Sequence, residues 1–63
     1  MTFAEQVKFA RKELKMSQEK LAKELDVSFS TINRWEKGHV MPSYIAQQSF
    51  LELCKKNGIK FEG

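Results

Sequence analysis

Cysteine, histidine and glycine are scarce in this chain, and each shortage excludes a class of site. The single cysteine, Cys54, has no partner for a disulfide within the chain and forms no thiolate pair for zinc. The one histidine, His39, has no second ligand at a metal-binding spacing and no nucleophile in register with it. No glycine-rich phosphate loop occurs. We therefore expect no metal, no cofactor and no enzymatic activity.

Long hydrophobic runs are also missing. No apolar run approaches the roughly 18 residues that a membrane-spanning helix needs. Glu5, Lys8 and Arg11 interrupt the start of the chain, so it contains no hydrophobic region of a signal peptide. The sequence therefore predicts a cytoplasmic protein that does not associate with membranes.

The chain is small and mildly basic. Its 63 residues predict one domain, 1–63, near the lower limit for folding without disulfides or metals. Apolar residues make up 41% of the chain, which is enough for one small core. The net charge of +3 suits a nucleic-acid partner without requiring one.

The stretch from Ser17 to Gly38 organises the chain, because it predicts two short helices joined by a tight turn. Ser17 and Ser28 each precede a helical pattern, where a hydroxyl accepts a hydrogen bond from an otherwise unpaired backbone N–H. Asp26 lies at the turn, where a left-handed residue often ends a helix, and Gly38 is placed to end the second helix. This spacing is typical of a helix-turn-helix, here over about residues 18–37.

The second of these helices has two chemically different sides when it is drawn at 100° per residue. The apolar side, which we expect to face the core, holds Ile32 and Trp35 together with Glu36. The opposite side, with Phe29 at its border, holds Ser30, Asn33, Arg34 and Lys37. Such polar side chains can form hydrogen bonds with base edges when a helix lies in the major groove of DNA.

The rest of the chain predicts two more helices and a short tail. Thr2 and Glu5 fit a capping box, and an apolar stripe beginning at Phe3 follows. Ser43 is placed to begin a last helix that Asn57 and Gly58 end, and the apolar residues of the tail, Ile59 and Phe61, are expected to fold back onto the core. The expected helices are 3–14 or 3–15, 18–25, 29–37 and 44–56. The fold class is therefore all-α, one compact bundle.

These residues resemble the Cro and phage-repressor type of helix-turn-helix domain, from Phe3 to about Cys54. The motifs that carry the resemblance are Arg11, Ser17-Gln18-Glu19, Leu21-Ala22, Val27-Ser28, Ser30-Thr31-Ile32, Trp35-Glu36, Lys37-Gly38 and Pro42-Ser43. The resemblance implies a bundle of four or five helices that binds double-stranded DNA, usually as a two-fold dimer. It also implies that Arg11 forms an ion pair with Glu36.

The resemblance further implies roles for individual residues at the DNA. The base-reading positions are Phe29, Ser30 and Arg34, with Asn33 beside them. The positions near phosphates are Gln18, Ser28, Thr31, Lys37 and His39. Arg34 either contacts a base or phosphate or is a solvated helix arginine, and Ser30 and Asn33 are either readers or merely exposed. Lys37 is equally consistent with an ordinary surface lysine.

Three features depart from the family pattern. Asp26 replaces the usual glycine of the turn, and the chain ends soon after the fourth helix, where many relatives have a fifth that helps them dimerise. Phe29 replaces a polar side chain at the first base-reading position. Its ring either contacts a thymine methyl group or packs over Ile32 at the rim of the core.

The leading hypothesis is a sequence-specific, DNA-binding transcriptional regulator, a repressor rather than an activator because the chain is small. The alternative is a protein-interaction module or antitoxin of the same fold that docks a protein partner. Phe29 and Phe9 motivate this alternative, and Phe9 lies nearly opposite the apolar stripe of the first helix. It is either one exposed aromatic ring or a contact with a second copy or another protein.

Overall fold

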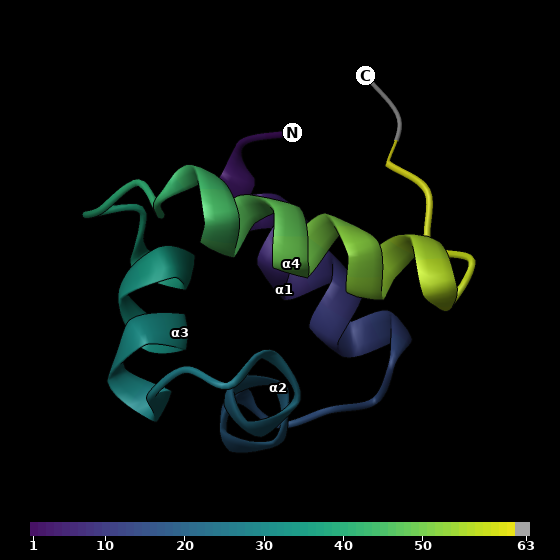
Figure 1. The fold of residues 1–63 in the computed structure, drawn as a ribbon, viewed down its shortest axis with the longest axis horizontal. Coiled ribbons are helices and arrows are strands. Elements are labelled where there is room, and N and C mark those ends of the chain that lie inside the picture. Colours follow the sequence, from purple (N-terminus) through teal and green to yellow (C-terminus); the bar gives the residue numbers. More distant parts are fainter. Residues whose placement is uncertain (62–63) are drawn as a thin grey trace.

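The structure, a computed structural model, describes residues 1–61, and these form four helices without strands. The helices are α1 (Phe3–Glu13), α2 (Gln18–Leu25), α3 (Phe29–Lys37) and α4 (Tyr44–Lys56). The all-α fold is as predicted, with four helices rather than five in this part of the chain. α3 contacts both α1 and α2, and α4 contacts α2. Figure 1 shows α3 at one end of the molecule, away from the C-terminal end of α4.

Each helix begins at the hydroxyl group that the sequence predicts as its N-cap. Thr2 Oγ1 accepts a hydrogen bond from the Glu5 backbone N–H, and Glu5 Oε1 accepts one from the Thr2 N–H in return. The Oγ atoms of Ser17, Ser28 and Ser43 each accept from the backbone N–H three residues further on, at 3.0, 3.1 and 3.2 Å. These caps determine where α2, α3 and α4 begin, and the structure confirms the predicted bounds of the three helices.

Left-handed residues determine where the helices end. Asp26 (φ 57°) and Gly38 (φ 76°) cap α2 and α3 in this conformation, as predicted. α1 ends at Glu13, whereas the sequence predicts an end at Leu14 or Lys15. Lys15 is itself left-handed (φ 55°), so the chain leaves the helix before it. The end of α1 was missed because no glycine marks this turn.

The core forms where the apolar sides of all four helices meet. Its buried residues are Val7, Ala10, Leu21, Ala22, Ile32, Trp35, Phe50 and Cys54. The Phe3 ring makes edge-to-face contacts with Trp35 and Phe50, at 5.5 and 5.4 Å between ring centroids, and so joins α1, α3 and α4. In α4 the buried side chains are Phe50 and Cys54, whereas Tyr44 and Leu51 are exposed.

The tail after α4 folds back as predicted. Ile59 and Phe61 both pack against the core, and the Phe61 ring stacks on Phe50 with centroids 6.2 Å apart. Phe61 also makes an edge-to-face contact with Phe9 of α1, at 5.9 Å. Within residues 1–61 no helix is long and apolar enough to cross a membrane.

Candidate nucleic-acid interface

α3 has the two sides that its sequence predicts. Ile32, Trp35 and Glu36 are buried, so this side is fixed against the core. On the opposite side Ser30, Arg34 and Lys37 are exposed. α3 carries no acidic residue in its first turn, and its only acidic residue, Glu36, faces inward. The outer side of α3 therefore presents hydrogen-bond donors and positive charge to solvent.

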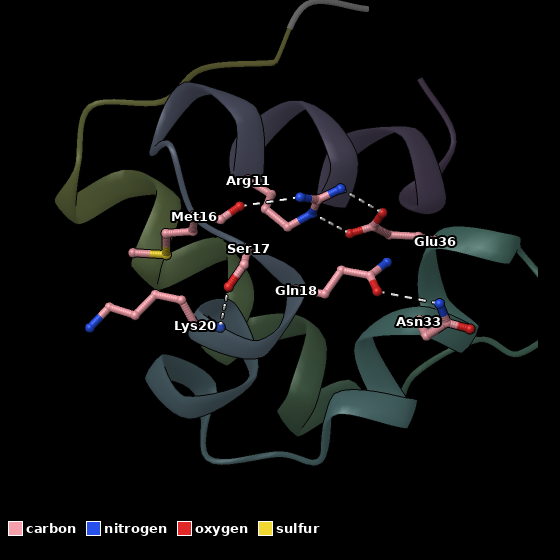
Figure 2. A network of polar contacts seen from close by, with 7 residues as sticks. All are labelled: Arg11, Met16, Ser17, Gln18, Lys20, Asn33 and Glu36. Atoms are coloured by element: carbon pink, nitrogen blue, oxygen red, sulfur yellow. Dashed lines mark hydrogen bonds and ion pairs between the residues drawn. The ribbon is translucent and has the colours of Figure 1, made fainter.

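The buried acidic side chain of α3 is held by the predicted ion pair. Arg11 Nε donates to Glu36 Oε2 at 2.8 Å, and Arg11 Nη2 donates to Glu36 Oε1 at 3.2 Å. The guanidinium also donates through Nη1 to the backbone carbonyl of Met16, at 3.2 Å. Figure 2 shows this group between α3 and the connector that leads into α2. Arg11, a residue of α1, thus contacts both α3 and the connector that precedes α2.

A second polar contact lies one helical turn before Glu36. Asn33 Nδ2 donates to Gln18 Oε1 at 3.3 Å (Figure 2). Gln18 is the first residue of α2, and both side chains are half-buried. This contact brings together a residue predicted at a phosphate and one predicted at a base. No pattern in the sequence predicts this pairing, because the two residues lie far apart in the chain and neither belongs to an apolar pattern.

Three hydroxyl groups cluster at the start of α3. Ser28 Oγ, which caps the helix, lies 2.7 Å from Thr31 Oγ1 and 3.1 Å from Ser30 Oγ. Hydroxyl groups both donate and accept hydrogen bonds and rotate to suit the partner. Since α3 begins here, these groups lie beside its unpaired backbone N–H groups, a suitable environment for an anion.

The structure shows the surroundings of Phe29 and Phe9, the two aromatic side chains for which the sequence leaves alternatives open. Phe29 is 52% exposed and does not pack against the core, which contradicts its interpretation as part of the core rim. Phe9 is 36% exposed and contacts Phe61 of the same chain. The chain's own tail therefore makes a contact with the ring that had suggested an external partner.

The remaining candidates lie at the end of α3 and in the loop that follows. Lys37 and His39 are both exposed. Among residues 1–61 no three histidine, cysteine, aspartate or glutamate side chains are grouped to hold a metal ion. Within the described part of the chain, Glu5 and Cys54 have shifted pKa values, and both lie away from this surface. Hydrogen bonds from Thr2 lower the pKa of the Glu5 carboxyl, and burial raises the pKa of the Cys54 thiol to about 11.

Comparison with known protein families identifies a helix-turn-helix in the same part of the chain. The model of the Cro/C1-type helix-turn-helix family matches residues 7–46, more than half of the chain. The chain belongs to this family. The matched segment of this helix-turn-helix protein contains Arg11, Glu36 and the whole of α2 and α3. Membership makes the chain a DNA-binding regulator of the Cro/repressor type, from a family whose members are in general not enzymes. No curated protein and no solved structure gave a significant match.

Proposed function

We propose that the chain recognises a specific sequence in duplex DNA, with α3 in the major groove, and acts as a transcriptional repressor. The observation that carries the proposal is the contrast between the two sides of α3. The inner side is buried and holds Glu36 in an ion pair, whereas the outer side exposes Ser30, Arg34 and Lys37. An α-helix fits the major groove, where base edges can be read by such side chains.

Base contacts are assigned to the exposed side chains near the start and middle of α3. The guanidinium of Arg34 can donate two hydrogen bonds to O6 and N7 of a guanine, and the hydroxyl of Ser30 can bond with any base. The exposure of Phe29 favours the other alternative for its ring, apolar contact with the methyl group of a thymine.

Backbone contacts are assigned to residues around these readers. Gln18 begins α2, and Lys37 with His39 follows the reading residues of α3. Ser28 and Thr31 offer hydroxyl groups at the start of α3. Contacts of this kind fix the orientation of a protein on the duplex and carry little sequence information. Repression follows from occupancy alone, because a protein that covers its site blocks access to the same DNA.

A second copy of the chain is proposed to dock on the exposed apolar surface formed by Val40, Met41, Tyr44 and Ile45, which are 47–77% exposed. Residues 38–51 contain no Asp, Glu, Lys or Arg, although 30% of the whole chain is charged. A two-fold interface brings the same surface of both copies together, so a charged residue there would meet its like. The surface follows α3 directly, and a dimer built on it would present two reading helices to half-sites about 34 Å apart.

The dimer is tested by sedimentation of the free protein. Ile45→Lys places a charge on the apolar surface and is expected to give a monomer with unchanged thermal stability. Gln48→Lys adds the same charge at another exposed position of α4 and should remain a dimer. A wild-type chain that sediments as a monomer at every concentration used for DNA binding would refute the interface.

The DNA-binding proposal is tested by selection from a randomised duplex library at about 0.1 M salt, where nonspecific phosphate contacts are already weakened. A recovered two-fold-symmetric sequence is the expected result. A single half-site would support base reading by a monomer. Recovery of duplexes without any common sequence would contradict specific recognition and leave only backbone binding.

The exposure of Phe29 on the outer side of α3 also favours one alternative, a protein-docking module or antitoxin. In that case the folded chain would bind no duplex even at low salt and would form a stoichiometric complex with one protein. Phe29→Ala should then abolish the protein complex, whereas under the DNA proposal it should reduce affinity only for sites with the contacted thymine.

A further inference from the structure

We infer that Asn33 is a positioning residue, which holds the carboxamide of Gln18 so that its amino group binds a DNA phosphate. The inference rests on the proposed DNA binding and deepens it. It also revises the predicted role of Asn33 as a base reader.

The contact between the two side chains has a defined polarity. Asn33 donates and Gln18 accepts, through Nδ2 and Oε1 at 3.3 Å. Among residues 1–61 no hydrogen bond engages Gln18 Nε2, and no buried side-chain nitrogen or oxygen lacks a partner. Gln18 Nε2 is therefore accessible to solvent. Figure 2 shows Oε1 as the end of the carboxamide that is directed at Asn33.

This polarity matters because a carboxamide has an accepting end and a donating end. Phosphate oxygens in DNA only accept hydrogen bonds, so Gln18 can bind one only through Nε2. The last torsion of a glutamine side chain has two broad, nearly equivalent orientations, and a free Gln18 would populate both. While Asn33 Nδ2 donates to Oε1, Gln18 is held in the orientation that leaves its own donor available.

The backbone around Asn33 and Gln18 is held in place by the contacts of Arg11. Glu36, one turn beyond Asn33, is fixed by Arg11, and Arg11 also bonds to the carbonyl of Met16 just before α2. The backbone positions of Asn33 and Gln18 are thus set by a second, partly buried set of contacts. A side chain already held in its bound orientation loses less conformational freedom on binding.

The test combines a measurement on the free protein with a measurement on DNA. Without DNA, the side-chain amide of Gln18 is followed by NMR relaxation in the wild type and in Asn33→Ala. We expect this amide to become more mobile in the variant, with the melting temperature unchanged. An amide of equal mobility in both proteins would overturn the inference without any reference to DNA.

On the selected duplex, affinities are compared for Gln18→Ala, Asn33→Ala and the double variant. Each single change should weaken binding several-fold, the double variant should lose no more than Gln18→Ala alone, and the losses should be equal on sites with altered base pairs. Arg34→Ala is the matched control, since it should change base preference. Additive losses, or a change of preference at one base pair caused by Asn33→Ala, would instead make Asn33 a base reader.

A reversed polarity gives a second, independent variant. In Asn33→Asp the carboxylate can only accept, so Gln18 must turn its amino group inward and its oxygen toward the phosphate. Binding should be weaker than in Asn33→Ala. In the Gln18→Ala background the difference in affinity between Asn33→Asp and Asn33→Ala reports only the added charge, so this difference should be smaller there. A difference of the same size in both backgrounds would contradict the inference. If the wild type binds no duplex, the proposed function itself fails, and the phosphate role of Gln18 fails with it, whatever the mobility of its amide.

Discussion

Two polar contacts, one helical turn apart, connect α3 to its neighbours, one to α1 and one to α2, and they differ in charge, number and burial. The Glu36 contact is charged and made twice to Arg11, and its carboxylate is buried, with 5% of the Glu36 side chain and 23% of the Arg11 side chain exposed. The Asn33 contact is neutral, single and half-buried, at 3.3 Å. Residues at this spacing lie on neighbouring positions of a helix surface. The ion pair therefore holds α3 against the core, and the Asn33 hydrogen bond connects side chains nearer the surface.

The difference has an energetic consequence. Removing one partner of a buried, charged pair leaves the other desolvated and unpaired, and this costs more than the pair itself contributed. A half-buried amide that loses its partner is rehydrated at little cost. The first contact should thus determine whether the domain folds, and the second how well it binds.

The largest expected effect comes from breaking the deep contact. Glu36→Ala should lower the free energy of unfolding by roughly 2–3 kcal/mol, because Arg11 keeps its partly buried charge without its partner. Urea unfolding measures the change, and Glu52→Ala on the exposed side of α4 is the control that removes the same carboxylate at no cost. Equal midpoints for the two variants would show that the ion pair contributes nothing to stability.

Removing the main proposed base contact should leave the deep contact untouched and weaken DNA binding. Arg34→Ala is expected to cost about 1–3 kcal/mol on the selected site and to relax preference at one or two base pairs. Fluorescence anisotropy on the selected duplex and on single-base variants measures both effects. Lys37→Ala is the comparison, since loss of a phosphate contact weakens all sequences alike. A uniform loss in Arg34→Ala would make this arginine a phosphate contact.

A smaller effect should come from relieving the turn between α2 and α3. Asp26 is left-handed, a conformation that glycine adopts without strain, so Asp26→Gly should raise the free energy of unfolding by about 0.5–1 kcal/mol. If the two contacts, rather than this residue, set the angle of α3, the selected DNA sequence should not change. A gain in stability accompanied by an altered sequence preference would show that the turn sets the angle.

The last effect should appear only at alkaline pH, on the α4 side of the core. Burial raises the pKa of Cys54 from 9.0 to about 11, so the unfolded chain loses this proton first and stability falls as the pH rises across that interval. The neutral Asn33 contact has no proton to lose. Cys54→Ala should therefore show a shallower decline in unfolding midpoint between pH 9 and 11 than the wild type. Parallel declines in the two proteins would assign the effect to other groups.

The sequence predicts much of this arrangement, because several local signals agree. Ser17, Ser28 and Ser43 are N-caps that determine helix starts from their own hydroxyl groups, and the starts of α2, α3 and α4 are correct for that reason. The burial of Trp35 and Glu36 followed from helical periodicity. The ion pair of Glu36 with Arg11 followed from the family resemblance, and the structure confirms it.

The rest depends on tertiary structure that no local pattern encodes. The contact between Gln18 and Asn33 requires the angle between α2 and α3, which the sequence does not specify. Phe29 lies at the border of the helical wheel, so its exposure depends on whether a neighbouring element reaches it, and none packs it into the core. α1 ends early because Lys15 adopts a conformation that its residue type does not favour.

The burial of Trp35 has a practical consequence. It is the chain's single tryptophan, it lies on the inner side of α3 with 4% of its surface exposed, and it contacts Phe3 of α1. Its fluorescence therefore reports on the packing of α3 against the core. Because the indole faces away from the proposed groove, DNA that binds a rigid α3 should leave the emission maximum where it is. An emission maximum that moves on addition of DNA would reveal that α3 shifts against the core as it binds.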